Sequence, residues 1–457
     1  MSLSYINGDT IVALATAPLP AGVAVVRVSG PAAWSVGVSL MPVLMGAEVG
    51  KLVYGPVGGD IDRGMGVKFK APASFTGEDV VEFHTHGGRA VVQAVLERCR
   101  GMDGVRPALA GEFSRRAVMN GKMDITAAEG LADLIAATTE AQRRQAVRQL
   151  DGALGARFEH WRAEILKLLA QVEAGIDFPD EELEVLADPA LAAGMQTVLA
   201  DLQAAMGERA GERVREGIRL AIVGKPNAGK STLLNLLAGQ DVAIVSPLAG
   251  TTRDVVTSTL DIGGYPVVVA DTAGLRETDD VIEAEGVRRA LKQAAHADVV
   301  VAVVDGHGFP HDVEELGEVL VLGRTLVVVS RAEEFELDFP SDVEGYPVVA
   351  VNLLEREALG RVLPVIQTLV EDVAAGASEA AMLTRERHRV AVEEAVMGLG
   401  RALVQMQDAR IKMQEGSVSE LVAEDLRSAA AAVGRVTGRT TSEDVLDVVF
   451  STFCVGK

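Results

Sequence analysis

One glycine-rich octapeptide limits the possible folds of this chain more than any other feature. The sequence GKPNAGKS at 224–231 fits the pattern GxxxxGK[ST], follows the apolar run 220–223 and precedes the helical pattern 232–238. A strand, a loop and a helix in this order form the context in which the pattern binds phosphates. Its glycines let backbone N–H groups surround the phosphates, Lys230 can neutralise the β- and γ-phosphates, and Ser231 can bind Mg²⁺. The motif therefore predicts a nucleotide site in an α/β domain.

The region 217–373 alternates strand-like and helix-like segments. Its short apolar runs are each followed by a turn or helix signal, and they lie at 220–223, 267–270, 299–304 and 326–329. Such runs are typical of parallel strands that are buried on both faces of a sheet. We therefore expect a Ras-like P-loop G domain over 217–373.

The regions on either side of this G domain have other patterns. Residues 1–119 combine strand-like runs at 23–28 and 80–83 with a helical stretch near 90–100, which indicates an α+β module. Helical periodicity fills 120–216 and 374–457. The apolar stripes are Val147, Leu150, Leu154, Phe158, Trp161, Ile165, Leu168, Val172 and Ile176 in the first half, and Val392, Val396, Leu399, Leu403 and Met406 in the second.

These patterns predict a multidomain fold of the α+β and α/β classes. Gly152 and Gly155 are candidate breaks in the first helical stripe, which stops at 177–179. Further helices are expected at 421–433 and 442–453. In the simplest architecture, one discontinuous helical domain consists of two sequence-separated halves, and the G domain is inserted between them.

Two more segments fit a GTPase that switches with its nucleotide. DTAG at 271–274 follows an apolar strand, where Asp271 can hold the Mg²⁺ shell and Gly274 can sense the γ-phosphate, and GTTRD at 250–254 offers a threonine hydroxyl for Mg²⁺. Leu275 and Arg276 follow DTAG in place of a water-orienting glutamine. Glu283 is a candidate for that role, although composition alone favours a solvated acidic segment.

Composition restricts the setting in which the chain acts. The chain has 457 residues, a net charge of −22 and two cysteines, Cys99 and Cys454. So acidic a chain is a poor non-specific binder of nucleic acid, because phosphate neutralisation needs Lys and Arg. No run of about 18 apolar residues suggests a membrane span, and the first residues lack the pattern of a secretory signal. The two cysteines make no disulfide framework, so we expect a cytoplasmic protein.

Motifs along nearly the whole chain resemble the bacterial MnmE (TrmE) family of tRNA-modification GTPases. The resemblance is weakest at about 30–60, 183–215 and 305–350. The motifs that carry it are DTI at 9–11 with AT at 15–16, VRVSGP at 26–31, APASFTGEDVVE at 71–82, HGG at 86–88, GEFS at 111–114, NGKMD at 120–124, DFPDEE at 177–182 and FCVGK at 453–457.

The resemblance implies an activity and a partner. Members act with an MnmG (GidA)-type protein that carries FAD and NADH, in a heterotetramer, and add an aminomethyl or carboxymethylaminomethyl group to C5 of the tRNA wobble uridine. The carbon comes from a tetrahydrofolate in its 5-formyl or methylene form. The N-terminal module would form a homodimer and bind the folate. By motif match, the folate site would be lined by Arg27, Glu82, Lys122 and Lys457. Arg and Lys suit folate carboxylates, and Glu suits the pterin N–H groups.

The resemblance also implies a complete nucleotide site. K⁺ would take the place of an arginine finger, bound by Asn227, Ser246, Leu248 through its carbonyl, and Thr251. Mg²⁺ would be bound by Ser231 and Thr252, and Glu283 would orient the water, with Lys230 as the other catalytic residue. The GTP-binding residues would be Asn227, Ala228, Gly229, Lys230, Ser231, Thr232, Ser246, Pro247, Leu248, Ala249, Gly250, Thr251, Thr252, Asp271, Thr272, Ala273, Gly274, Ser330, Arg331 and Glu333.

The chain departs from the family pattern in three places. Ser246 stands where threonine is frequent, and PLPAG at 18–22 replaces a glycine/arginine-rich turn. SRAE at 330–333 replaces the guanine-specificity motif Asn-Lys-x-Asp, which puts guanine selectivity in question.

For three other candidate residues, Cys454, His84 and His86, the sequence allows more than one role. Cys454 is a candidate nucleophile or redox thiol, although a lone cysteine is more often inert. His84 and His86 lie two apart on a predicted strand, where packing or hydrogen bonding is favoured over metal binding. The competing function is a GTP-gated RNA or ribosome assembly factor without modification chemistry. Binding of 5-formyltetrahydrofolate would separate the two functions, because an assembly factor needs no folate site.

Overall fold

The computed structural model describes residues 8–177, 186, 188–239, 243–244, 259–269, 294–335, 338–375, 382–412, 418–439, 446, 449–450, 453 and 456. These residues form two compact units. The first comprises residues 1–132 and 433–457, and the second comprises residues 133–432. In the described part of the chain, no helix is long and apolar enough to span a membrane.

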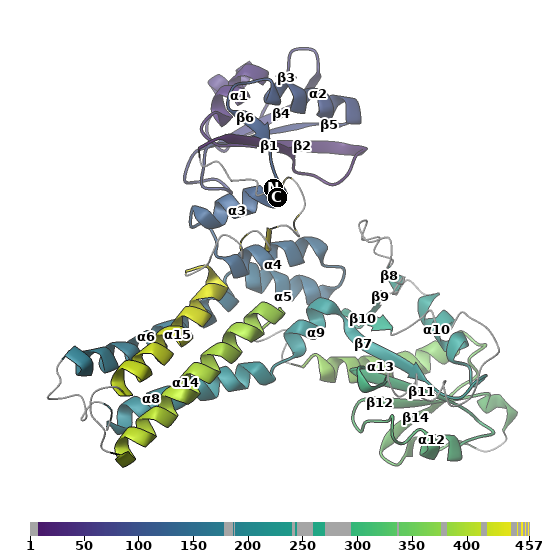
Figure 1. Ribbon diagram of the computed structural model, residues 1–457. Helices are drawn as coiled ribbons and strands as arrows, with labels where there is room; N and C mark the ends of the chain where they lie inside the picture. The colour runs from purple at the N-terminus through teal and green to yellow at the C-terminus, as the bar shows by residue number, and fades with distance from the viewer. Residues whose placement is uncertain are drawn as a thin grey trace. The chain divides into compact units, whose positions relative to one another are not determined.

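The first unit is built on a six-stranded sheet in the order β3-β4-β5-β2-β1-β6 (Figure 1). Helices α1 and α2 pack on one face through a core that includes Val26, Val81 and Phe83. The elements are β1 (Thr10–Leu14), β2 (Ala21–Ser29), α1 (Ala33–Leu40), η1 (Pro42–Met45), β3 (Val53–Val57), β4 (Asp62–Phe69), β5 (Val80–Gly87), α2 (Arg89–Arg100), β6 (Val105–Pro107), α3 (Glu112–Met119) and α4 (Ile125–Ala136). The α+β prediction for this region is confirmed.

Described residues near the C-terminus belong to the first unit as well. Phe450 and Phe453 pack with Ala128, in a small core separate from that of the sheet. Gly456 has a φ of +99°, and a Cβ at this position would lie 2.0 Å from the carbonyl oxygen of Leu14. The backbone at 456 therefore approaches β1 closely, and only glycine allows that approach.

The second unit holds an eight-stranded sheet in the order β13-β14-β12-β11-β7-β10-β9-β8. β7, β10, β11, β12 and β14 pair in parallel, and β8, β9 and β13 pair antiparallel. The strands are β7 (Ile218–Val223), β8 (Ala243–Ile244), β9 (Thr259–Ile262), β10 (Tyr265–Val269), β11 (Val299–Asp305), β12 (Thr325–Ser330), β13 (Asp342–Val343) and β14 (Tyr346–Ala350).

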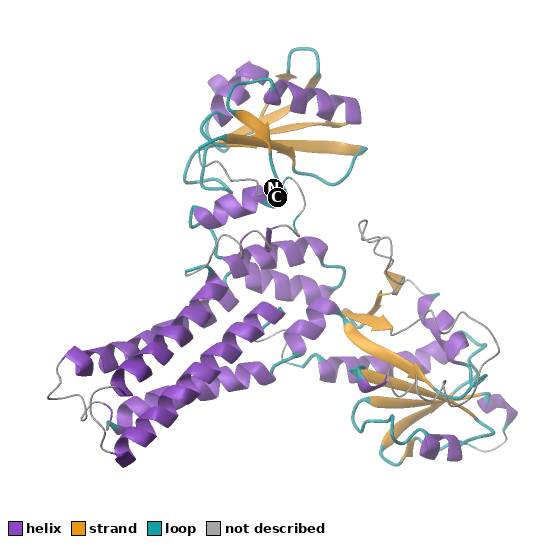
Figure 2. Ribbon diagram, viewed as in Figure 1, coloured by secondary structure: helices purple, strands orange, loops and turns teal. Residues whose placement is uncertain are grey.

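Strand β11 shows why these apolar runs become central strands. Val299, Val301 and Val303 face a core with α10 (Lys230–Ala238) and α13 (Glu357–Val373). Val300, Ala302 and Val304 face the other core, with α12 (His311–Glu315) and the residues after it. Helices thus cover both faces of the sheet (Figure 2). A strand that is buried on both faces needs an apolar residue at every position, as the sequence predicted.

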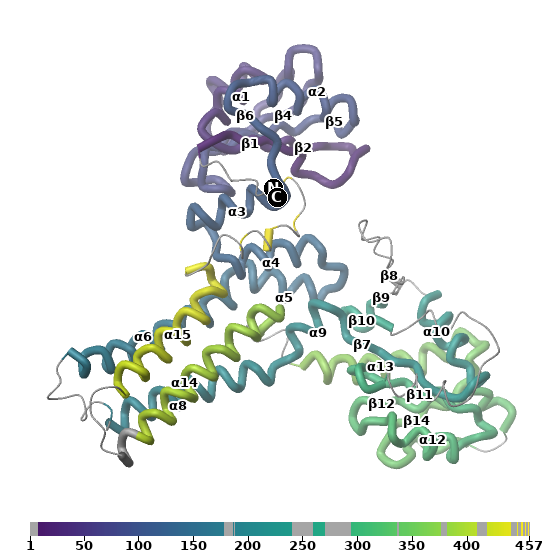
Figure 3. Tube along the Cα trace, viewed as in Figure 1, coloured from purple at the N-terminus to yellow at the C-terminus, as the bar shows by residue number. Residues whose placement is uncertain are grey.

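Helices from both sides of the G domain pack together in the same unit. Their bounds are α5 (Glu140–Leu150), α6 (Ala153–Asp177), α8 (Pro189–Gly207), α9 (Ala210–Glu216), α14 (Glu386–Lys412) and α15 (Val418–Thr437). Figure 3 shows α8 and α14 side by side, although the G domain separates them in sequence. Of the two candidate breaks, Gly152, with a φ of +88°, separates α5 from α6, whereas Gly155 is buried inside α6.

The α6 stripe supplies much of this helical core. Phe158 and Trp161 are almost fully buried, and their rings meet edge to face at 5.1 Å. The indole Nε1 of Trp161 donates a hydrogen bond to Asp201 of α8 at 2.6 Å, so the buried N–H group has a partner. Helix α15 confirms the prediction for 421–433, and most of 442–453 lies outside the described residues. The four domain boundaries stay a prediction.

Candidate nucleotide-binding site

The loop between β7 and α10 has the backbone geometry that its glycines predict. A Cβ on Gly224 would lie 2.1 Å from the carbonyl oxygen of Val303, and Gly229 has a φ of +104°. Both positions therefore require glycine. The loop lies at the edge of the sheet where β7, β11, β12 and β14 have their carboxyl ends, which is the edge where ligands of open α/β sheets bind.

The side chain of Lys230 lies inside the curve of this loop. Its ammonium donates hydrogen bonds to the carbonyl oxygens of Gly224 at 2.9 Å and Lys225 at 2.6 Å. Burial lowers the pKa of Lys230. The two carbonyl groups hold the cation at the first turn of α10, where unpaired N–H groups also favour an anion.

Two polar side chains of the loop are free to bind a cation. Asn227 is exposed in the left-handed region, with a φ of +62°, and Ser231 is exposed in the first turn of α10. In the described part of the chain, neither side chain makes a hydrogen bond. Their oxygen atoms therefore fit K⁺ and Mg²⁺, which prefer oxygen ligands. Thr232 follows on α10, half-buried, and Ala228 is buried.

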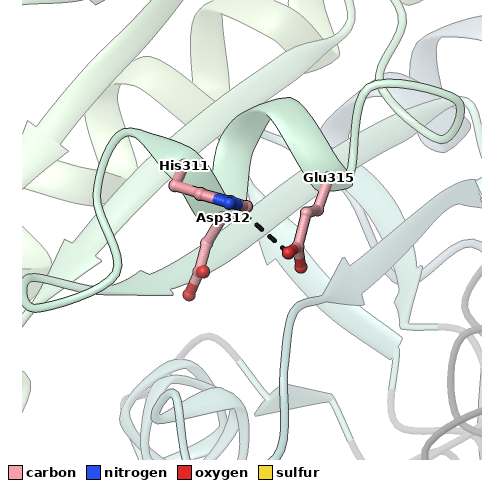
Figure 4. Close-up of side chains that lie close together, drawn as sticks. All are labelled: His311, Asp312 and Glu315. Carbon is pink, nitrogen blue, oxygen red and sulfur yellow. Dashed lines mark ion pairs between the residues drawn. The ribbon is translucent and has the colours of Figure 1, made fainter.

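Lys225 connects the loop to α12. Its ammonium binds Asp312 at 2.7 Å and Glu315 at 2.6 Å, and these contacts raise its pKa. Figure 4 shows His311, Asp312 and Glu315 on this short helix, with an ion pair of 3.4 Å between His311 and Glu315. The three side chains lie close enough together to share a metal ion. The ammonium of Lys225 already pairs with both carboxylates, and these contacts connect the loop to α12.

The base-recognition loop follows β12. Ser330 is buried, and its hydroxyl donates a hydrogen bond to the carbonyl oxygen of Ala228 at 2.7 Å. Arg331, with a φ of +55°, pairs with Asp305 at 3.1 Å. Glu333 is exposed in η2 (Ala332–Glu334). Ser330 and Ala228 are 102 residues apart in sequence, so the bond brings two of the predicted segments together.

Many predicted nucleotide and metal ligands lie outside the described residues. They are Ser246, Pro247, Leu248, Ala249, Gly250, Thr251, Thr252, Asp271, Thr272, Ala273, Gly274 and Glu283. Cys454 and Lys457 also lie outside them. Their roles stay predictions.

The predicted folate residues that are described lie in the first unit. Arg27 of β2 and Glu82 of β5 are cross-strand partners, and Arg27 Nε donates to Glu82 at 2.8 Å. The Arg27 guanidinium also lies over the rings of Phe75 and Phe113, at 5.2 and 5.6 Å. Lys122 donates to the carbonyl oxygen of Pro72 at 2.9 Å. The loop that carries Pro72 and Phe75 thus contacts both Lys122 and Arg27.

The two histidines lie beside carboxylates, and Cys99 lies in a hydrophobic core. His84 Nε2 lies 3.5 Å from Glu82, and His86 Nδ1 lies 2.9 Å from Asp62. Within the described ranges, neither histidine belongs to a group of three candidate metal ligands. Cys99 is fully buried, and burial raises the pKa of its thiol to about 12, so it is unsuited to nucleophilic chemistry.

Sequence reasoning missed three side chains that shape the nucleotide site. Asp305 pairs with Arg331, and Asp312 and Glu315 bind Lys225. Only Asp305 left a signal, because it is a carboxylate at the carboxyl end of an apolar strand. The contact between Lys225 and Asp312 spans 87 residues, which no local pattern shows.

Comparisons with known proteins cover both units. The family model of the MnmE helical domain matches residues 125–454, and that of the GTP-binding protein TrmE N-terminus matches 10–122. The tRNA modification GTPase MnmE of Rhodospirillum rubrum is 46% identical over 468 residues, which cover 98% of this chain and 99% of that protein. The protein of the same description from Caulobacter vibrioides is 46% identical over 458 residues, with 98% and 100% covered.

The comparison with solved structures gives only weak similarities. The G domain of the T. maritima FeoB iron transporter matches 34% of this chain and 98% of its own, at 22% identity and a TM-score of 0.25, values too low to bear on function. The family models and the relatives agree along almost the entire sequence. The chain therefore belongs to the MnmE family of tRNA modification GTPases.

Proposed function

We propose that this chain is a K⁺-activated GTPase that acts in tRNA modification in the cytoplasm. With an FAD-dependent, MnmG-type partner in a heterotetramer, it adds a (carboxymethyl)aminomethyl group to C5 of the wobble uridine, using a tetrahydrofolate carbon. Family membership supports this activity. The observation that carries the nucleotide half is the position of Lys230, whose ammonium is fixed inside the loop by two backbone carbonyls.

Three described residues of the loop would have separate tasks in hydrolysis. Lys230 neutralises the β- and γ-phosphates, and the N–H groups at the start of α10 bind them. Ser231 would hold Mg²⁺, and Asn227 would hold K⁺ at the rim of the loop. When bound, the two cations supply positive charge that offsets the charge developing on the transferring phosphoryl group. Glu283 is our candidate for orienting the water.

The folate half rests on the first unit. Arg27 and Glu82 are both mostly buried and satisfy each other. A ligand that carries a carboxylate and paired N–H groups can exchange with this pair without leaving a buried charge unpaired. Gly456 approaches Leu14, which is the neighbour of Ala13 on β1, and Ala13 is the cross-strand partner of Arg27. This proximity supports the proposal that Lys457, the next residue, lines the same site in the homodimer.

The K⁺ requirement tests the nucleotide half. The rate of GTP hydrolysis should be at least about tenfold higher in KCl than in NaCl at equal ionic strength, because the bound cation stabilises the transition state. Asn227→Ala should remove most of that difference, whereas Asn235→Ala, a change of an exposed asparagine of α10 outside the loop, should preserve it. Equal rates in the two salts would contradict K⁺ activation and leave the P-loop assignment intact.

A further inference from the structure

The hydroxyl of Ser330 is already engaged within the protein. The residue is 3% exposed, and its Oγ donates to the carbonyl oxygen of Ala228 at 2.7 Å and lies 3.4 Å from the carbonyl oxygen of Val304. A serine hydroxyl has one proton to donate. Because that proton is directed to the phosphate-binding loop, Ser330 has none to offer a nucleotide base.

The neighbouring donors also have partners. Arg331 pairs with Asp305, which accepts further hydrogen bonds from the backbone N–H of His307 at 3.0 Å and from its Nδ1 at 2.9 Å. Burial opposes ionisation of Asp305, but the bonds from His307 and the charge of Arg331 outweigh it and lower its pKa. An ionised Asp305 therefore holds the guanidinium of Arg331 in place.

Asn352 follows β14 at the same edge of the sheet. Its Nδ2 donates to Glu355 at 3.0 Å, and its Oδ1 accepts from the N–H of Leu354 at 3.0 Å. Both ends of its amide thus make a hydrogen bond within its own turn.

Glu333 differs from all of these side chains. It is exposed, and in the described part of the chain it has no hydrogen bond or ion pair. A carboxylate accepts hydrogen bonds and donates none. Among its described side chains, the loop therefore offers a nucleotide one free carboxylate acceptor, while the hydroxyl of Ser330 is engaged and the guanidinium of Arg331 is held by Asp305.

These observations restrict which edge of a base the loop can recognise. Guanine presents donors at N1 and N2 and an acceptor at N7. We infer that this chain recognises guanine through Glu333 at the N1/N2 edge and makes no hydrogen bond to N7, and that Ser330 is a positioning residue that ties the base-recognition loop to the phosphate-binding loop. This inference rests on the proposed binding of guanine nucleotides.

Replacement of N7 by carbon tests the inference directly. The affinities of the full chain for GDP and 7-deaza-GDP should be measured by displacement of a fluorescent GDP, because the diphosphates are not hydrolysed. We expect the two dissociation constants to agree within about twofold, since no hydrogen bond is lost. In Ser330→Asn, whose amide can donate to N7, 7-deaza-GDP should bind roughly three- to tenfold more weakly than GDP.

Two further variants separate the effect of the Ser330–Ala228 hydrogen bond from that of base recognition. Ser330→Ala should weaken GDP and 7-deaza-GDP by the same factor, because it removes only the bond to Ala228. Glu333→Gln should weaken GDP and strengthen the diphosphate of xanthine, because an amide can donate to the oxygen at C2. It should leave the ratio of GDP to 7-deaza-GDP unchanged. The ratios of GDP affinity to 7-deaza-GDP affinity in these two variants test the inference even if Ser330→Asn does not fold.

Two results would contradict the inference. If the native chain binds 7-deaza-GDP fivefold or more weakly than GDP, N7 is recognised and the inference is wrong. Loss of that difference in Arg331→Met or Asn352→Ala would then identify the donor. If GDP itself does not displace the probe, the proposed nucleotide binding fails together with the inference.

Discussion

The nucleotide site and the Arg27–Glu82 site are built from different kinds of groups. At the nucleotide site, backbone carbonyls fix Lys230, and glycines let the chain turn at the carboxyl edge of a parallel sheet. At the second site, two opposite charges face each other across antiparallel strands, with aromatic rings against the guanidinium. The main chain supplies most of the first site, whereas side chains supply the second. Among the described side chains of the first site, Lys230 should therefore be the most sensitive to substitution.

The largest effect should follow the loss of Lys230, the side-chain cation that we propose binds the phosphates. Lys230→Ala should lower the turnover of GTP by at least about 100-fold, because it removes a fixed charge from the transition state. Lys167→Ala is the matched control, since Lys167 is an exposed lysine of α6 that pairs with Glu164 on its own helix. Turnover is measured by phosphate release. A Lys230→Ala variant with normal turnover would show that the transition state is stabilised sufficiently without the charge of Lys230.

A smaller effect is expected from the charge pair of the first unit. Arg27→Met should weaken binding of 5-formyltetrahydrofolate about tenfold or more, because a charge-assisted hydrogen bond is lost and Glu82 is left without its partner. GTP hydrolysis should stay within about twofold. Arg63→Met is the control, because Arg63 is an exposed arginine of the same sheet that lies over Tyr54. Titration calorimetry would measure the folate affinity of both variants. Equal affinities would show that Arg27 does not bind the folate.

The smallest effect should come from the contact between the loop and α12. Lys225→Met should weaken GDP binding roughly twofold to fivefold, since the Lys225 side chain is 44% exposed and ion pairs that solvent screens contribute little. Lys225→Arg, which keeps the charge, should restore most of the affinity. The turnover at saturating GTP should change less than the affinity, because the contact positions the loop and does not touch the phosphates. A change confined to turnover would contradict this role.

Local patterns predicted the elements of the G domain because one short segment carries each of them. The run predicted at 299–304 is β11 (Val299–Asp305), and the run at 326–329 lies inside β12 (Thr325–Ser330). The partners of the predicted residues could not be read in this way. Nothing near Ser330 indicates its bond to Ala228, and nothing near Arg27 indicates that Phe113 lies under it. Such contacts depend on strand order and on packing between segments that are distant in sequence.

The wobble nucleosides of tRNA test the central claim most directly. A bacterial strain that lacks its own MnmE should be given this chain, and its tRNA should be digested and analysed by mass spectrometry. We expect the aminomethyl or carboxymethylaminomethyl group at C5 of the wobble uridine to return with the native chain, and not with Lys230→Ala or Arg27→Met. Stable expression of a native chain that hydrolyses GTP but leaves the wobble uridine unmodified would contradict the account and favour an assembly factor.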